Sequence, residues 1–434
     1  MREPKKKPLS LILFMAGLVL LPYDSVSYII PSFYAPVSLI VFTLYCVVYT
    51  VAHRRIQLNR GWLRFLPFYG FAVISGAVIV AFRREQFPVF KEFLLTLTIG
   101  LGMLLALTTG MREYREHYGA EWPERFMKLL GWAYLLPLIV GFVELLSLRG
   151  LLPGSVKEAI NRFFTGGGCW RLAITTHEAS WAANQMIMAS GAYLCCFVWT
   201  KKKIWILPLV GSLFLFVMTM SAQGIGVMLI GLVLWAAALL VRMKDRKKAL
   251  RNLVFMIAGL AAGLAALYLL LHWLPDGYYV KRLLAFSSVE QALASDNSVF
   301  MRVGLLAVHL LIFLNHWIIG VGGGGFRLFA WETIARYFPA SLGLDEVNAF
   351  RGGVASTEMS FYFSVLSEQG IIGLLLFGWF WLRSFRNVCR IQRTTLILFI
   401  CMLLAFPVQH GSWALIPFWL AIAMLNLYEP ERTE

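Results

Sequence analysis

The stretch FYFSVLSEQGIIGLLLFGWFWL, residues 361–382, decides the fold class of this chain. Glu368 is its one charged residue, and the other positions are apolar or small and polar. An α-helix rises about 1.5 Å per residue, so a helix of this length crosses the roughly 30 Å hydrocarbon core of a bilayer. The stretch therefore predicts a transmembrane helix.

Similar apolar runs recur along the chain, in which 59% of residues are hydrophobic and 14% are charged. Soluble domains carry about 25% charged residues, so water would solvate such a surface poorly. We predict an all-α polytopic membrane protein, a single integral membrane domain over residues 1–434, with about twelve transmembrane helices. The predicted spans are 8–23, 36–52, 62–82, 90–109, 127–147, 178–199, 204–221, 223–241, 253–274, 360–382, 394–408 and 412–428.

Basic residues between the spans set the predicted orientation. With the N-terminus inside, 26 of the 39 lysines and arginines fall in cytoplasmic segments, as the positive-inside rule requires. Both termini are then cytoplasmic. The net charge of +16 reflects topology and contact with anionic membrane lipids, and no nucleic-acid partner is expected. Two large extracytoplasmic loops remain, residues 148–177 and 275–359.

Residues 301–318 are apolar enough for a further span, but we predict an amphipathic helix that lies on the outer membrane surface within the second loop. A span here would turn the basic loop 383–393 outward, against the charge bias. Arg302, His309 and His316 are seven residues apart and therefore form one polar stripe on this helix.

The sequence RLAITTHEASWAANQ, residues 171–185, places ionisable side chains where the chain re-enters the membrane. Ionisable residues at a membrane mouth are candidates for function, because their burial there is costly. Arg171, His177, Glu178 and Ser180 are therefore candidates. The alternative is an interfacial anchor, with Arg171 at lipid phosphates.

Arg302 and the run GVGGGGF, residues 320–326, form a second candidate motif. Glycine-rich turns let backbone N–H groups approach an anion, as in nests. Flexible connectors have the same composition, and the run lacks the strand, spacing and lysine of a P-loop. A hinge is therefore the alternative.

Arg351 and Glu358 precede the span at 360–382 and form a third candidate motif. Glu358 is a candidate general base, because a carboxylate at a partly desolvated membrane surface has a raised pKa. The run Ser356-Thr357-Glu358 equally suits the N-terminus of a helix, so an N-cap is the alternative. His410 lies in the tight turn between the last two spans.

The order of these motifs resembles that of the bacterial O-antigen ligase and polysaccharide polymerase superfamily, over about residues 165–382. The shared pattern is an outside arginine at a mid-chain span, a Thr/Ser-x-x-Gly turn, an arginine with Gly-x-Gly-x-Phe, and a Glu-x-Gly-Ile-Ile-Gly helix. Here these elements are Arg171 with THEASWAA, TMSAQGIG at 219–226, Arg302 with Gly320, Gly322 and Phe326, and SEQGIIG at 367–373.

The resemblance implies a GT-C-like membrane glycosyltransferase that takes an undecaprenyl-diphosphate-linked glycan as donor at the outer face of the bacterial cytoplasmic membrane. Arg171 and Arg302 would hold the diphosphate, since guanidinium groups match it in charge and geometry. Arg351, Gly322 and Gly323 are further candidates for this site. Members of the superfamily need no metal, and this chain has no CxxC motif or Cys/His cluster with metal-ligand spacing, so no cofactor is expected.

Two positions depart from the superfamily pattern. Met359 stands where ligases carry His, and Gln223 stands where many members carry Arg. The catalytic base therefore stays open between four candidates, which are Glu358, Glu178, His177 and His410.

The sequence Thr-His-Glu-Ala-Ser at 176–180 resembles the Glu-Pro-Ser of exopolysaccharide polymerases, which favours a polymerase of lipid-linked repeat units. The alternatives are a ligase that transfers the glycan to lipid A core or another acceptor, and, in a different class, a lipid-linked glycan flippase or other transporter. The expected partners are the donor, a glycan or lipid-linked glycan acceptor, membrane lipids, and a flippase and a chain-length regulator.

Overall fold

The structure is a computed structural model that describes residues 7–23, 36–54, 58–164, 171–242, 289–352 and 360–429, together with the single positions 247, 251 and 254. Every regular element within these residues is a helix. Glu358 and nearly all of the predicted span 253–274 lie outside the described residues.

The helices follow one another in two halves. The first half contains α1 (Leu9–Val19), α2 (Val37–His53), α3 (Arg60–Phe82), η1 (Arg84–Gln86), α4 (Phe87–Tyr118), η2 (Gly119–Glu121), α5 (Trp122–Ala133), α6 (Leu135–Leu148) and α7 (Gly154–Phe164). The second half contains α8 (Ala179–Thr200), η3 (Lys203–Trp205), α9 (Ile206–Met218), α10 (Ala222–Arg242), α13 (Val289–Ser295), α14 (Asn297–Val299), the π-helical turn η4 (Phe300–Gly304), α15 (Leu305–Asn315), α16 (Phe326–Tyr337), η5 (Pro339–Gly343), α17 (Asp345–Asn348), η6 (Ala349–Gly352), α18 (Phe361–Phe385), η7 (Arg386–Arg390), α19 (Thr394–Ala405), η8 (Phe406–Val408) and α20 (Ile416–Asn426).

The chain is an all-α, multi-pass membrane protein. Five helical stretches of the described residues are long and apolar enough to cross a bilayer, namely Arg60–Phe82, Arg84–Leu148, Ala222–Arg242, Asn297–Asn315 and Phe361–Arg390. Five shorter apolar helices accompany them, and Arg84–Leu148 covers two of the predicted spans. The total of about twelve spans stays a prediction.

The centre of the bundle is formed by α8, α19 and α20, which are buried along most of their length. Because protein surrounds α8, this helix can carry polar side chains where a lipid-facing helix would not. The Tyr134 hydroxyl from α5–α6 donates to the Gln185 side chain of α8, and both groups are buried. The outer helices instead expose large apolar side chains such as Phe82 and Leu375, as expected where lipid is the solvent.

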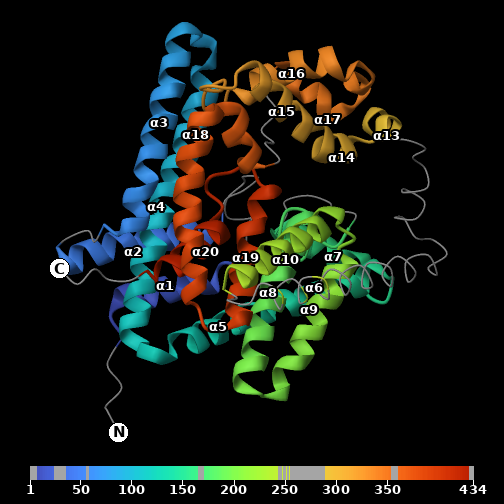
Figure 1. The fold of residues 1–434 in the computed structure, drawn as a ribbon. Coiled ribbons are helices and arrows are strands. Elements are labelled where there is room, and N and C mark those ends of the chain that lie inside the picture. Colours follow the sequence, from blue (N-terminus) through green and yellow to red (C-terminus); the bar gives the residue numbers. More distant parts are fainter. Residues whose placement is uncertain are drawn as a thin grey trace.

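A cap formed by α13–α17 has a small core of its own beside the bundle. Figure 1 shows this group, in yellow and orange, at the end of the long helices α3 and α18. Phe300, Leu305 and Ile312 from the 300–315 helix pack there against Phe326 and Ile334 of α16. The helix that the sequence predicts over 301–318 thus ends at Asn315 and covers much of its apolar face with protein.

Of the three residues in the predicted polar stripe on that helix, the middle one, His309, faces the bundle. His309 is fully buried, its Nδ1 lies 2.7 Å from the Ser367 hydroxyl of α18, and its ring stacks on Phe326 at 3.6 Å between centroids. Asn297–Asn315 also satisfies the length and composition of a span, so its placement on the membrane surface stays a prediction. Arg302 lies in the π-helical turn before α15, and His316 follows the last residue of α15, so a single stripe over all three residues stays a prediction. Contact with α18 decides that His309 is buried.

Helix α18 is interrupted at Gly370, which adopts φ 60° and ψ −160°. The chain before α16 lies against this break. Val321 and Gly322 donate backbone hydrogen bonds to Ser367 and Glu368, and Ile371 donates to Trp317. An added Cβ at Gly370 would lie 2.5 Å from the Ile318 carbonyl oxygen. The SEQGIIG motif is therefore a backbone junction between the bundle and the cap, because glycine permits both the positive φ and the close approach.

Candidate active site

A cavity of about 460 Å³ opens at the end of the bundle that carries the cap. Its walls come from six separate segments of the chain, and they combine a carboxylate, an imidazole and a guanidinium with apolar groups. The polar lining consists of Glu92, Thr96, Glu178, Ser180, Gln223, Arg327, Gln409, His410 and Ser412. Three of the candidate residues singled out from the sequence, Glu178, Ser180 and His410, thus line one cavity, although 232 positions of the chain separate Glu178 from His410.

The loop that carries Glu178 is held by a buried carboxylate of α6. Glu144 is fully buried, and it accepts hydrogen bonds from the backbone N–H groups of Ala173 and Ile174, the latter at 2.6 Å. Ile174 adopts φ 58°, a conformation that β-branched residues rarely take. The Thr175 hydroxyl also donates to the Pro22 carbonyl, at 2.7 Å. These bonds fix the approach of the chain to α8, whose N-cap is Glu178.

His410 is held against the same helix by aromatic packing. Its ring lies 4.6 Å from the Trp181 ring, and Trp181 in turn lies 6.5 Å from His177. The His410 carbonyl accepts from the Phe361 N–H at 2.9 Å, which ties this turn to the start of α18. Burial lowers the pKa of His410 from 6.5 to about 4. The imidazole is therefore neutral at pH 7 and can exchange hydrogen bonds with a substrate hydroxyl.

Arg302 and Glu178 both act on a third charged group, Glu346 of α17. Desolvation raises the pKa of Glu346, the Glu178 carboxylate raises it further, and the Arg302 guanidinium lowers it. Glu178 and Arg302 therefore both lie within electrostatic reach of Glu346. Arg302 is partly buried in η4, where its Nη1 donates to the Ser298 carbonyl at 3.1 Å. Arg302 itself is not among the residues that line the cavity.

Arg327 and Glu92 are cavity residues that the sequence motifs did not single out. Arg327 of α16 forms an ion pair of 2.6 Å with Glu92 of α4, where the arginine side chain is 16% exposed and the glutamate side chain 62% exposed. One signal in the sequence marked Arg327, since it directly follows GVGGGGF. Glu92 carried no comparable signal, because it sits at the edge of an ordinary apolar run.

The glycine run packs against helices. The Gly322 N–H donates to the Glu368 carbonyl at 2.9 Å, and an added Cβ at Gly322 would lie 2.8 Å from Ile79. An added Cβ at Gly323 would overlap the Phe93 ring. The Gly322 N–H is thus already bonded within the protein, and both glycines allow the chain to approach α3 and α4. In this run it is Gly324 that lines the cavity.

The remaining sequence candidates occupy different places. Arg171 is partly buried at the start of the loop that Glu144 holds, and it is not among the residues that line the cavity. Arg351 is exposed on η6, beside Phe350 of the cap core. Glu358 lies outside the described residues.

One flank of the cavity is apolar and descends along α4. Val89, Phe93 and Ile99 line it in turn, a rise of about 15 Å along the helix axis. Leu39 of α2 and Leu95 complete this flank, and Leu95 is 60% exposed on the outer surface of the bundle. The cavity therefore combines a polar end with an apolar side next to the membrane.

Comparison of the chain with protein-family models and with curated proteins finds no match in either case. Within the described residues, no group of three or more His, Cys, Asp or Glu side chains is arranged to hold a metal ion.

Proposed function

We propose that the chain is a membrane glycosyltransferase that polymerises undecaprenyl-diphosphate-linked oligosaccharide repeat units at the outer face of the bacterial cytoplasmic membrane. One observation carries the proposal: Glu178, His410 and Arg327 line one cavity at an end of the bundle, and Glu346 lies within electrostatic reach of both Glu178 and Arg302. A carboxylate, a neutral imidazole and guanidinium groups are what transfer from a diphosphate to a hydroxyl requires. The motif order from Arg171 to Gly373 supports the same family.

The arginines would bind the leaving group. A diphosphate concentrates negative charge, and a guanidinium offers paired N–H donors that match its oxygens. Arg302 from η4 and Arg327 from α16, both in the cap, would stabilise this charge as it grows in the transition state. Arg171, at the start of the adjoining loop, would hold the donor at the membrane surface.

Glu178 would act as the general base. The acceptor hydroxyl oxygen bonds to the anomeric carbon, the bond from that carbon to the diphosphate oxygen breaks, and the diphosphate leaves with the electron pair. The proton of the hydroxyl passes to the Glu178 carboxylate. His410, which is neutral at pH 7, would orient the acceptor by hydrogen bonding.

The apolar flank would receive the first isoprene units of the donor. Leu39, Leu95 and Ile99 offer an apolar surface beside the polar residues, and the exposure of Leu95 puts this surface at the lipid side of the bundle. A donor with a polar diphosphate and a long hydrocarbon tail matches both parts of the cavity.

The test uses purified full-length protein in detergent with a synthetic polyprenyl-diphosphate repeat unit. Glu178→Gln removes the base and should lower the turnover number at least 100-fold, the usual lower range for acid-base catalysis. Arg302→Lys keeps the charge but loses the planar fork, so we expect about a tenfold loss of kcat/KM. Glu332→Gln, on the exposed surface of α16, is the matched control and should leave activity unchanged.

Full activity of Glu178→Gln would show that Glu178 is not the general base. Full activity of both Glu178→Gln and Arg302→Lys would show that this cavity is not the active site. The products identify the reaction, because a polymerase extends lipid-linked chains from repeat units alone, whereas a ligase turns over only when a separate acceptor is added. Transport of the donor across vesicle membranes without any new glycosidic bond would instead indicate a flippase.

A further inference from the structure

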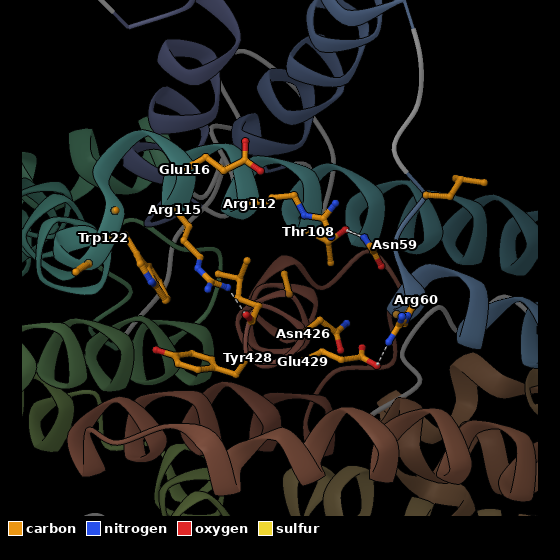
Figure 2. A pocket seen from close by; sticks show the side chains of 16 residues that line it. Asn59, Arg60, Thr108, Arg112, Arg115, Glu116, Trp122, Asn426, Tyr428 and Glu429 are labelled. Carbon is orange, nitrogen blue, oxygen red and sulfur yellow. Dashed lines mark hydrogen bonds and ion pairs between the residues drawn. The ribbon is translucent and has the colours of Figure 1, made fainter. Parts of the chain in front are cut away.

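A second and larger cavity, of about 1120 Å³, lies among the start of α3, the end of α4 and the C-terminal turn after α20. Figure 2 shows its side chains, with Arg112 and Arg115 of α4 on one wall and Arg60 of α3 across from them. Arg115 reaches the Leu427 carbonyl after α20, and Arg60 reaches Glu429. The cavity therefore gathers three arginines from segments that the sequence places in two separate loops.

This cavity lies at the opposite end of the bundle from the candidate active site. Phe93 lines the first cavity and Arg112 the second, and both belong to the continuous helix α4. Nineteen residues of helix correspond to about 28 Å, close to the roughly 30 Å of a bilayer hydrocarbon core. The charged residues that α4 contributes, Glu92 to the first cavity and Arg112 to the second, are therefore spaced about as the two headgroup layers of a membrane are.

The charge of the second cavity suits an anion. Two carboxylates, Glu116 and Glu429, line the cavity together with the three arginines. Glu429 is engaged by Arg64, in a two-pronged ion pair, and by Arg60 at 3.8 Å. Glu116 is exposed, as are the three arginines, so water screens all four charges, and the arginines still exceed the carboxylates in the lining. Arg115 donates one N–H to the Leu427 carbonyl at 2.6 Å, and a guanidinium has four further donors.

Asn426 gives an independent indication of a ligand. Its side-chain Oδ1 and Nδ2 are both buried, and neither has a hydrogen-bond partner among the described residues. Figure 2 places this amide between Arg115 and Arg60 at the wall of the cavity. Buried amide groups are nearly always hydrogen-bonded, so a bound group is expected to supply both a donor and an acceptor here.

The remaining walls indicate a lipid. Leu58, Leu427 and Ala423 are apolar, and Trp122 and Tyr428 also line the cavity. Trp and Tyr concentrate at membrane interfaces, where one end of the side chain meets hydrocarbon and the other meets polar groups. A free inorganic anion has no apolar part that could contact these walls.

We propose that this cavity binds the headgroup of an anionic glycerophospholipid, with the phosphate on Arg60, Arg112 and Arg115. The Asn426 Nδ2 donates to the phosphate, and its Oδ1 accepts from a headgroup hydroxyl, so phosphatidylglycerol fits the site. The bound lipid joins α3, α4 and α20 at the end of the bundle remote from the candidate active site. This proposal does not depend on the proposed glycosyltransferase activity.

The test is native mass spectrometry of the full-length protein in detergent, titrated with phosphatidylglycerol or with phosphatidylcholine of the same acyl chains. We expect one phosphatidylglycerol to bind with clear preference. Arg112→Gln should weaken it about fivefold, which corresponds to about 1 kcal/mol for one basic residue. Asn426→Asp places a carboxylate at the phosphate and should weaken binding at least as much. Arg125→Gln, exposed on the neighbouring α5 and paired with Glu121, is the matched control and should bind as wild type.

Three outcomes would overturn the proposal. Equal retention of phosphatidylglycerol and phosphatidylcholine would show that the cavity has no preference for an anionic headgroup. Wild-type affinity of both Arg112→Gln and Asn426→Asp, in protein that stays folded, places the lipid elsewhere. Displacement of the bound lipid by millimolar inorganic phosphate or glycerol phosphate would show a site for free anions.

Discussion

Replacing Glu144 should release the loop that leads to Glu178. In the native state the Glu144 carboxylate accepts from the Ala173 and Ile174 N–H groups at 3.2 Å and 2.6 Å, and all of these groups are buried. Glu144→Leu leaves both N–H donors without an acceptor, and each unsatisfied buried donor destabilises the closed loop by about 1–3 kcal/mol. The free energy of opening the loop should therefore fall by at least about 2 kcal/mol.

The strain at Ile174 adds to this effect. Its φ of 58° costs about 1–3 kcal/mol, and the closed loop persists because the surrounding bonds hold it. Once these bonds are lost, opening also releases the strain. Global stability is a poor measure of the change, because the substitution also removes a buried carboxylate whose desolvation is unfavourable.

Hydrogen–deuterium exchange measures the local change directly. Exchange at the 172–176 amides should rise roughly 30-fold or more in Glu144→Leu, since about 2 kcal/mol corresponds to that ratio. Glu144→Gln keeps one carbonyl acceptor, so exchange at the same amides should rise less than about tenfold in that variant. Amides in the middle of α8 serve as the internal reference. Exchange at the wild-type rate in Glu144→Leu would show that the carboxylate does not hold this loop.

Three further outcomes follow from the described contacts. Because burial lowers the pKa of His410 to about 4, the unfolded chain binds this proton more readily, so stability should fall as the pH drops from about 6.5 to 4. A His410→Asn variant should lose that part of the decline in a pH series of unfolding temperatures. Gly370→Ala should lower the unfolding temperature, because the new Cβ would lie 2.5 Å from a carbonyl oxygen and the residue adopts φ 60°. The control is Gly378→Ala, where an added Cβ meets no atom within 4 Å; this variant should be neutral or stabilising by up to about 1 kcal/mol. An unchanged Gly370→Ala would contradict the tight junction. In the donor assay, Arg327→Gln should raise KM and Glu92→Gln should lower it, because the two side chains carry opposite charges at the cavity mouth; shifts in the same direction would argue against an anionic donor there.

Several parts of the candidate site were predictable, since they depend on where a residue type falls relative to an apolar run. Glu178 stands at the start of α8 and His410 in the turn before α20, as the hydropathy pattern indicated. The roles of Gly322 and Gly323 were not predictable in this way. The same glycine run suits an anion nest, a hinge or a close helix contact, and only the positions of Ile79 and Phe93 distinguish the close contact.

The segments that the charge pattern assigns to one side of the membrane also meet at one end of the bundle. Arg60, Arg115 and Glu429 gather around the second cavity, and the turns that carry Glu178 and His410 gather around the first. Which end faces the cytoplasm stays a prediction from the positive-inside rule.

The sequence by itself determined that the protein is helical, crosses a membrane several times and keeps its polar residues near the ends of its spans. Those properties follow from local hydropathy and residue spacing, because a bilayer of fixed thickness imposes them on each segment separately. Tertiary structure alone decided that Arg327 and Glu92 join Glu178, that His309 faces α18, that α18 breaks at Gly370, and that Asn426 lines the same cavity as Arg60. These contacts join segments far apart in the chain, and their geometry depends on how side chains of different helices pack, which no periodicity within one helix encodes.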